Sequence, residues 1–232
     1  MKSFVLMAGL CASAAGLMAS TAQERLKEAT DVFQEVMATP DKSIPQDLLE
    51  KAQCAVIVPG LKKGAFIVGA EYGKGFVTCR NSSGRGWGAP AAIKVEGGSF
   101  GFQIGGEGTD VIMLLMNQSG MDKLSKSKFT VGADASVAAG PVGRASSAQT
   151  DAYMQAEILS WSRSKGLFAG VALKGATLRA DEDGNRELYG KKMTTREILN
   201  SHMEAPAAAS PLLGALDRYS MRKGSEADRQ SR

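Results

Sequence analysis

The sequence predicts an α+β fold in which a curved antiparallel β-sheet, closed towards a barrel-like sandwich, has N- and C-terminal helices packed against it. Two observations lead to this prediction. Both ends of the chain carry apolar residues at helical spacing, and the middle carries short apolar runs separated by glycine-rich turns. Several of the 27 glycines also lie inside these runs, which indicates bent strands or bulges.

The first 22 residues have the form of a secretory signal peptide. Lys2 precedes a mostly apolar run at residues 4–18, and Ser20-Thr21-Ala22 fits a small-x-small cleavage site. The run is short for a membrane span. We therefore expect a bacterial protein that is periplasmic or secreted, either free or associated with the envelope membrane. The alternative is a lipid anchor at Cys11, but the residue before it is leucine rather than the small residue that such a signal needs.

Residues 23–223 are expected to form a single domain, because no proline-rich or charged linker divides them. Residues 224–232 contain no large apolar side chain and are expected to be a disordered tail. The net charge of +4 is mildly basic, and aromatic and basic residues do not interleave. The composition therefore does not favour nucleic acid as a partner.

Four helices are expected outside the sheet. The first covers residues 24–38, where apolar side chains recur at helical spacing. Capping-box spacing places the starts of two more, at Ser43 to Gln46 and at Thr194 to Glu197. Ser210-Pro211 can begin the last helix, because proline suits the first helical turn.

The strands are expected between residues 55 and 178. Pro59-Gly60 is expected to end the first strand, and Asp183-Gly184 to form a hairpin turn after the last one. The expected strands cover residues 55–58, 65–70, 75–80, 91–95, 99–105, 110–116, 129–139, 152–161 and 167–178.

Cys54 and Cys79 remain after removal of the leader. An oxidising compartment permits a disulfide between them. The sequence does not say whether their Cα atoms come within bonding range. The alternative is a pair of small buried hydrophobic residues, and both interpretations stay open at this point.

The sequence contains no matched catalytic set. His202 is the only histidine, whereas metal sites and acid–base triads usually use more imidazole than that. The glycines at residues 97–108 match neither phosphate-loop pattern. The acidic run at residues 181–185 does not have the glycine position that an EF-hand requires. We therefore expect no enzyme, no cofactor and no metal.

Four segments in chain order resemble the SYLF family, a lipid-binding domain family also called the yeast-type actin-binding domain family. The first is similar to the family's opening and the other three to its signatures. The resemblance implies a curved β architecture with packed helices, and binding of phosphoinositides or other anionic lipids. Some eukaryotic relatives also bind actin filaments, a role that we do not expect for an exported bacterial protein. The segments are LLEKAQCAVIVPGLKKGAFIVGAEYGKGF (48–76), RGWGAPAAIKVEGGSFGFQIGGEGTDVIMLLMN (85–117), GADASVAAGPVGR (132–144) and SRSKGLFAGVALKG (162–175).

The basic residues favoured for lipid binding are Arg163 and Lys165, because they lie in the last signature. Lys62 and Lys63 follow, in the turn expected after Pro59-Gly60. Each lysine or arginine near an anionic surface can contribute about 1 kcal/mol. The alternative is that each group belongs to a solvated surface of mixed charge. The helix at residues 24–38 carries four carboxylates against two cations, which weakens the electrostatic case for lipid contact through that helix.

We therefore expect a non-enzymatic protein of the bacterial envelope that recognises anionic, phosphoinositide-like headgroups. One alternative is an envelope structural or interaction protein without lipid affinity. The other is a lipid-directed hydrolase, against which the missing pair of nucleophile and base argues.

Overall fold

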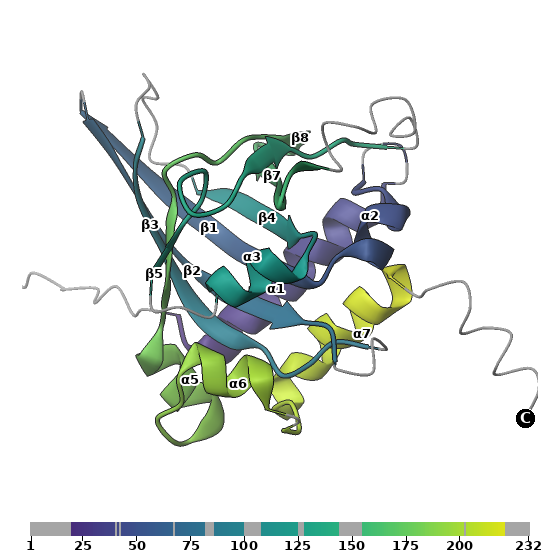
Figure 1. The fold of residues 1–232 in the computed structure, drawn as a ribbon, viewed down its shortest axis with the longest axis vertical. Helices are drawn as coiled ribbons and strands as arrows, with labels where there is room; N and C mark the ends of the chain where they lie inside the picture. The colour runs from purple at the N-terminus through teal and green to yellow at the C-terminus, as the bar shows by residue number, and fades with distance from the viewer. Residues whose placement is uncertain are drawn as a thin grey trace, which may run out of the picture.

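A curled β-sheet, with nine strands among the residues that the structure describes, forms the centre of the molecule in the computed structural model (Figure 1). The structure describes residues 20–39, 41, 43–66, 68–81, 86–99, 108–124, 128–143, 155–201 and 203–220. The helices near the N-terminal end and the C-terminal end of the described chain pack against this sheet. The predicted α+β class is confirmed. Residues 1–19 of the expected leader (1–22), residues 100–105 of the strand expected at 99–105, His202 and the expected tail (224–232) lie outside the described residues.

The sheet is antiparallel except at one edge. Its strands are β1 (Cys54–Phe66), β2 (Val68–Cys79), β3 (Ala91–Ser99), β4 (Thr109–Leu115), β5 (Lys128–Thr130), β6 (Val137–Ala139), β7 (Ile158–Ser164), β8 (Leu167–Gly170) and β9 (Thr177–Ala180). They follow the order β5-β9-β3-β2-β1-β4-β7-β6, and β8 pairs with the second half of β7. Among the described strands, only β6 and β7 are parallel, so the predicted antiparallel sheet is mixed at this edge.

The hairpin of β1 and β2 projects from the body of the molecule (Figure 1). The prediction that Pro59-Gly60 ends the first strand is wrong, because β1 continues to Phe66. The register shifts between Ile57 and Lys62, which marks a β-bulge. A bulge accommodates a proline, which has no N–H for the ladder, and Gly60 has a φ of 56° there. The segments expected as separate strands at residues 55–58 and 65–70 therefore belong to one hairpin.

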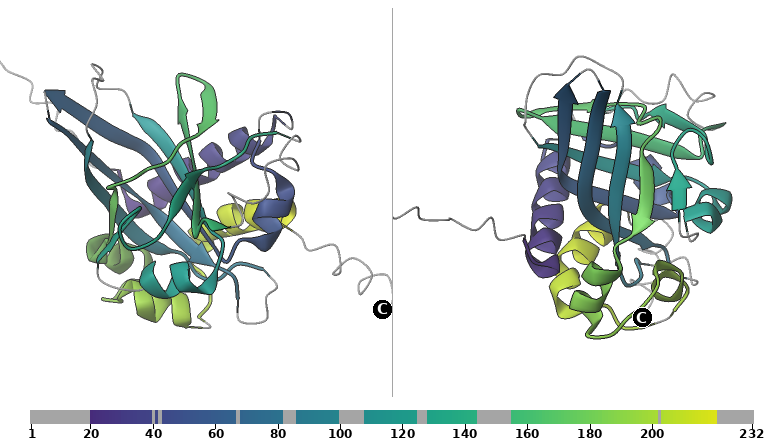
Figure 2. Two further views of the ribbon diagram at one scale, coloured as in Figure 1. Left: turned by 45° about the horizontal axis from the view of Figure 1, so that its top comes forward. Right: turned by 90° about the vertical axis from the view of Figure 1, so that its left-hand side faces the viewer.

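Helices α1 (Ala22–Met37) and α7 (Ser210–Tyr219) cover one face of the sheet (Figure 2). The short helix α2 (Gln46–Lys51) and the 3-10 turn η3 (Ala207–Ala209) lie beside them. Phe33 of α1 meets Tyr219 of α7 edge to face, with ring centroids 6.0 Å apart. The apolar cluster between helices and sheet includes Leu26, Phe33, Ile57, Phe76, Ile112, Trp161 and Leu216.

Helix α1 begins with a capping box. The Thr21 hydroxyl accepts a hydrogen bond from the Glu24 N–H at 3.2 Å, and the Glu24 carboxylate accepts one from the Thr21 N–H at 2.7 Å. Ala22 is fully buried. Cleavage after Ala22 remains a prediction, and it would remove a cap that typically contributes about 1 kcal/mol.

The inside of the curl is filled by a second apolar cluster, with α3 (Gln118–Leu124) and α6 (Thr195–Asn200) contributing to it. Cys54 and Cys79 are direct cross-strand partners in this cluster, and a disulfide joins them. The disulfide interpretation is therefore the one that the structure supports. Other members of the cluster are Val56, Leu61, Val77, Ile93, Met113, Phe129, Ile158 and Leu178. Alternate residues of β1 and of β4 thus belong to the two clusters, because successive side chains of a strand point to opposite faces of the sheet.

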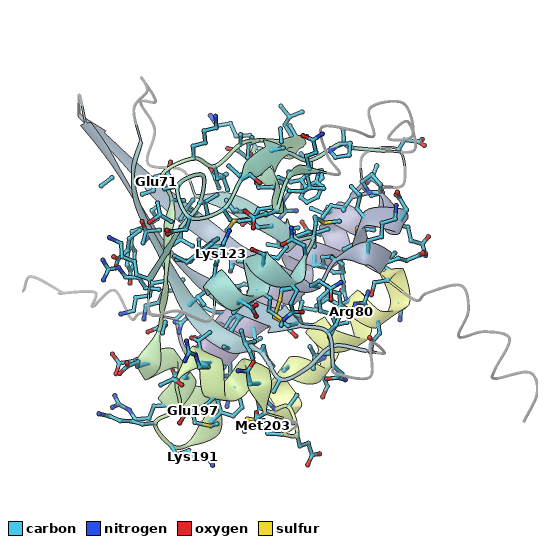
Figure 3. The ribbon with its side chains drawn as sticks, viewed as in Figure 1. Glu71, Arg80, Lys123, Lys191, Glu197 and Met203 are labelled. Carbon is cyan, nitrogen blue, oxygen red and sulfur yellow. A yellow bond between two sulfur atoms is a disulfide. The ribbon has the colours of Figure 1, made fainter. Side chains whose placement is uncertain are left out.

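Arg80 lies just past the end of β2 and connects the sheet to the helical layer through hydrogen bonds (Figure 3). Its Nη2 donates to the Leu49 carbonyl at 2.9 Å and to the Ser220 carbonyl at 3.1 Å. Its guanidinium also stacks over the Trp87 ring, 4.3 Å from the centroid. These carbonyls lie near the ends of α2 and α7, where backbone acceptors have no partner within the helix.

Three further predictions about local structure are wrong. Asp183-Gly184 does not form a hairpin turn, because both residues lie in α5 (Glu182–Tyr189), which ends at the left-handed Gly190. Helix α2 begins after Pro45 without a side-chain cap, so Ser43 forms no capping box there. The runs at residues 129–139 and 167–178 are each interrupted, by turns that separate β5 from β6 and β8 from β9. The Thr194 and Glu197 capping box is confirmed.

Candidate functional site

The residues predicted to bind lipid lie at one end of the sheet. β1 and β7 are both antiparallel to β4, so they run in the same direction. The Lys62 position near the end of β1 and the Arg163 position near the end of β7 therefore lie at the same end, with only β4 between the two strands. The structure thus brings together two groups that are about 100 residues apart in the sequence.

Arg163 is held by two carboxylates. Its Nε donates to Asp110 Oδ2 at 2.9 Å, its Nη2 lies 2.8 Å from the same oxygen, and its Nη1 donates to Glu35 of α1. Burial opposes the charge, but the hydrogen bonds to Glu35 and Asp110 raise the pKa of Arg163 above its ordinary value. Arg163 therefore joins β7, β4 and α1, and its charge is compensated within the protein.

Lys165 lies in a tight turn between β7 and β8. Lys165 has a φ of 50° and Gly166 has a φ of 75°, and the flanking residues Ser164 and Leu167 are cross-strand partners. Two left-handed residues in a two-residue loop are typical of a type I′ hairpin. The Lys165 side chain is exposed.

Lys62 and Lys63 lie in a strand, not in the expected turn. Lys62 is exposed and faces Tyr72 of β2, which is also exposed, at 47%. Within the described residues no carboxylate pairs with Lys62. The side chain of Lys63 lies outside the described part of the structure.

Four further cations form a continuous row across four neighbouring strands. Lys74 of β2 is the cross-strand partner of Lys94 of β3, and Lys94 is the partner of Arg179 of β9. Arg179 is in turn the partner of Lys128 of β5. Neighbouring strands lie about 4.8 Å apart, so this cationic row spans roughly 14 Å. Lys74 lies on the same sheet face as Phe76, two positions along β2, and Lys94 lies on the same face as Ala92, two positions along β3. Both apolar residues belong to the cluster between the sheet and helices α1 and α7.

Carboxylates compensate part of the cationic row. Lys74 Nζ lies 3.0 Å from Asp181 Oδ2, and Lys94 Nζ lies 3.9 Å from Asp181 Oδ1. Arg179 Nε lies 3.3 Å from Glu96 Oε2. Lys128 is exposed and has no carboxylate partner within the described part of the chain. Four cations and two carboxylates leave a formal charge of +2 on the row.

Sequence analysis did not find the row, because its cross-strand partners are 20, 85 and 51 positions apart in the chain. The sequence did contain one signal for these positions: an otherwise apolar segment is interrupted by a cation at Lys74, at Lys94 and at Arg179. Only the strand register shows that they are opposite one another, and register depends on pairing partners that the sequence does not name.

The fold and this site define an α+β domain whose curled sheet carries a row of cations at the border of its helical layer. The chain belongs to the Ysc84 family, described as Las17-binding protein actin regulator, whose model matches residues 96–219. The family relationship that the sequence signatures indicated is thereby confirmed.

Curated relatives match most of the chain. It is 36% identical over 190 residues to an SH3 domain-containing protein of Schizosaccharomyces pombe, which covers 80% of the chain and 44% of the relative. It is 35% identical over 180 residues to LAS seventeen-binding protein 3 of Saccharomyces cerevisiae, covering 76% of the chain and 39% of the relative. It is 34% identical over 191 residues to human SH3 domain-containing YSC84-like protein 1, covering 82% and 55%. The chain therefore spans about half of the length of these relatives or less.

Proposed function

We propose that this domain is a non-enzymatic lipid-binding protein that recognises anionic, phosphoinositide-like headgroups through the cationic row. The register supports the proposal, because like charges placed directly opposite each other lower the stability of a sheet. Four cations placed side by side across four neighbouring strands therefore favour an external anion as their partner. The formal charge of +2 on the row provides the attraction.

The residues predicted from the sequence extend this proposed contact. Lys62 and Lys165 offer exposed positive side chains at the same end of the sheet, and Lys63 neighbours Lys62 in β1. Arg163 contributes by holding β7 against β4 and α1, and its own charge is already compensated. We propose a bacterial envelope membrane as the setting, with the protein periplasmic or secreted after removal of residues 1–22.

No helix among the described residues has the length and apolar character that crossing a bilayer requires.

Vesicle co-sedimentation tests the proposal. The variant Lys128→Glu/Arg179→Glu reverses two exposed charges of the row. Because each cation near an anionic surface contributes about 1 kcal/mol, affinity for phosphatidylglycerol vesicles at low salt should fall at least about thirtyfold. Binding by the unaltered protein should weaken as salt rises, since exposed charges are screened.

The matched control is Lys51→Glu/Lys191→Glu, which changes the net charge equally. Lys51 ends α2, and Lys191 lies at the opposite end of the molecule from Glu71 on the projecting strands (Figure 3). The control should retain most of the affinity. Equal losses in both variants would mean that net charge, and not the row, governs binding.

A second candidate is an interaction protein without lipid affinity, which the names of the yeast relatives as Las17-binding proteins favour. Folded protein that ignores every anionic vesicle at low ionic strength would support this alternative over lipid binding. A hydrolase would need a nucleophile and base in contact, and we do not propose one.

A further inference from the structure

Asp181 is a buried carboxylate under the cationic row. It follows β9 and immediately precedes α5, and it is 1% exposed. Its backbone is fixed on both sides, because its N–H donates to the Ala92 carbonyl at 3.0 Å and its carbonyl accepts from the Asn185 N–H at 2.8 Å. The carboxylate therefore has a defined place between the sheet and α5.

The partners of this carboxylate are the two lysines of the row. Lys74 Nζ and Lys94 Nζ lie 3.0 Å and 3.9 Å from its oxygens, and their side chains are 30% and 31% exposed. Among the described residues, neither carboxylate oxygen accepts a well-aligned hydrogen bond. Such a group is costly to bury unless charge compensates it. Asp181 thus depends on these two ammonium groups.

Gly184 keeps the space that the carboxylate occupies. A Cβ atom at Gly184 would lie 2.9 Å from Asp181 Oδ2 and 2.9 Å from the Ala92 Cβ. Glycine lowers helix stability relative to alanine by about 1 kcal/mol, yet it stands inside α5 at this position. The local sequence therefore leaves room for Asp181 at the expense of helix propensity.

We propose that Asp181 is a positioning residue that holds the ammonium groups of Lys74 and Lys94 side by side, so that both can bind one phosphate group from outside. The two lysines are direct cross-strand partners and repel each other without an anion between them. Each ammonium carries three N–H donors, so the pairing with Asp181 leaves donors for a further anion. This inference rests on the proposed function and assigns the phosphate to this part of the row.

The direction of the affinity change separates positioning from simple attraction. Asp181→Asn adds one unit of positive charge beside the two lysines. If the row only attracts anions, this variant should bind anionic vesicles as tightly as the unaltered protein or more tightly. If Asp181 positions the lysines, the variant should bind more weakly, because two long side chains must then be ordered on binding.

Gly184→Ala provides a second variant that changes no charge and displaces the carboxylate. Gly214→Ala in α7 is its matched control, because a Cβ atom there meets nothing within 4 Å. Binding is measured on the full chain with phosphatidylcholine vesicles that contain phosphatidic acid. A parallel titration with inorganic phosphate shows whether the protein binds free phosphate as well, or binds a phosphate group only when it belongs to a lipid in a membrane.

We expect Asp181→Asn and Gly184→Ala each to lose at least about fivefold in vesicle affinity, while Gly214→Ala binds like the unaltered protein. Undiminished affinity in either folded variant overturns the inference, and Gly184→Ala decides it if Asp181→Asn does not fold. If Lys128→Glu/Arg179→Glu loses binding while both of these variants keep it, the proposed function stands and the positioning role is wrong. If the unaltered protein binds no vesicle, both fail.

Discussion

Arg163 and Asp110 face each other across β7 and β4, and the Arg163 guanidinium approaches Asp110 Oδ2 through Nε at 2.9 Å and Nη2 at 2.8 Å. The other oxygen of Asp110 accepts a hydrogen bond from the Gly60 N–H at 2.9 Å. One carboxylate therefore joins the end of β7 to the bulge of β1. Sequence position made Arg163 a candidate for lipid contact, and the contacts show that it also holds this end of the sheet together.

The first prediction concerns the stability that Arg163 provides. Because its side chain is 23% exposed and Asp110 is 19% exposed, Arg163→Met should lower the free energy of unfolding by about 2 kcal/mol. Arg163→Lys should recover only part of this loss, since a lysine cannot place two N–H donors on one carboxylate in the same geometry. Urea denaturation measures both variants.

Arg186→Met is the control for that measurement. Arg186 pairs with Asp183 on the surface of α5, with side chains 53% and 73% exposed. Exposed pairs contribute little, so the loss should stay below about 0.5 kcal/mol. Equal effects of the two substitutions would contradict the structural role of Arg163.

The second prediction concerns the disulfide between Cys54 and Cys79, which are 25 positions apart in the sequence. Reduction should lower the free energy of unfolding by about 3 kcal/mol, because the unfolded chain loses the constraint of a closed loop. Denaturation with and without a reductant measures the difference. The double variant Cys54→Ala/Cys79→Ala should not respond to the reductant, and a response there would assign the effect to another cause.

The third prediction contrasts two glycines. A Cβ atom at Gly140 would lie 2.0 Å from Trp161 Cε2, in a fully buried part of the sheet edge. Gly140→Ala should therefore destabilise the fold by about 3 kcal/mol or more. Gly214→Ala, in open space on α7, should instead raise stability by about 0.5 to 1 kcal/mol through helix propensity. Thermal unfolding compares them, and a tolerated Gly140→Ala would show that Trp161 is packed differently.

The fourth prediction concerns acid. Lys123 of α3 donates to Glu157 at 2.8 Å, and the Ser136 N–H donates to its other oxygen at 3.0 Å. The hydrogen bond from Lys123 holds the pKa of Glu157 below its ordinary value of 4.5. A depressed carboxyl pKa stabilises the fold above the unfolded-state value, and this contribution disappears as the pH falls through the lower folded-state pKa.

The free energy of unfolding should therefore fall between about pH 5 and about pH 3, and the fall should be shallower in Glu157→Gln. Denaturant titrations across this range compare the two proteins. Identical slopes would show that Glu157 is not among the acid-sensitive groups.

Much of the fold followed from local patterns. The helical spacing at residues 24–38, the capping box at Thr194 and Glu197, and the start at Ser210-Pro211 each predicted a helix that the structure contains. These signals succeed because helix caps and amphipathic faces involve residues within a few positions of one another. The signature segments likewise indicated the family that the comparisons confirm.

The predictions that were wrong depended on distant partners. Pro59-Gly60 ends many strands, but here a bulge is held by Asp110 from 50 positions away. Asp183-Gly184 reads locally as a turn, whereas packing of α5 against β3 keeps it helical. In each case a tertiary contact outweighed a local preference of about 1 kcal/mol.

The sequence by itself determined the helices at both ends and the strand-rich middle, because periodicity and caps involve residues only a few positions apart. The family was indicated separately, by the resemblance of the signature segments. Only the tertiary structure decided that Lys74, Lys94, Arg179 and Lys128 form one row, that Asp181 lies beneath it, and that Arg163 is compensated. Strand register brings these side chains together, and register arises from pairing between segments far apart in the chain.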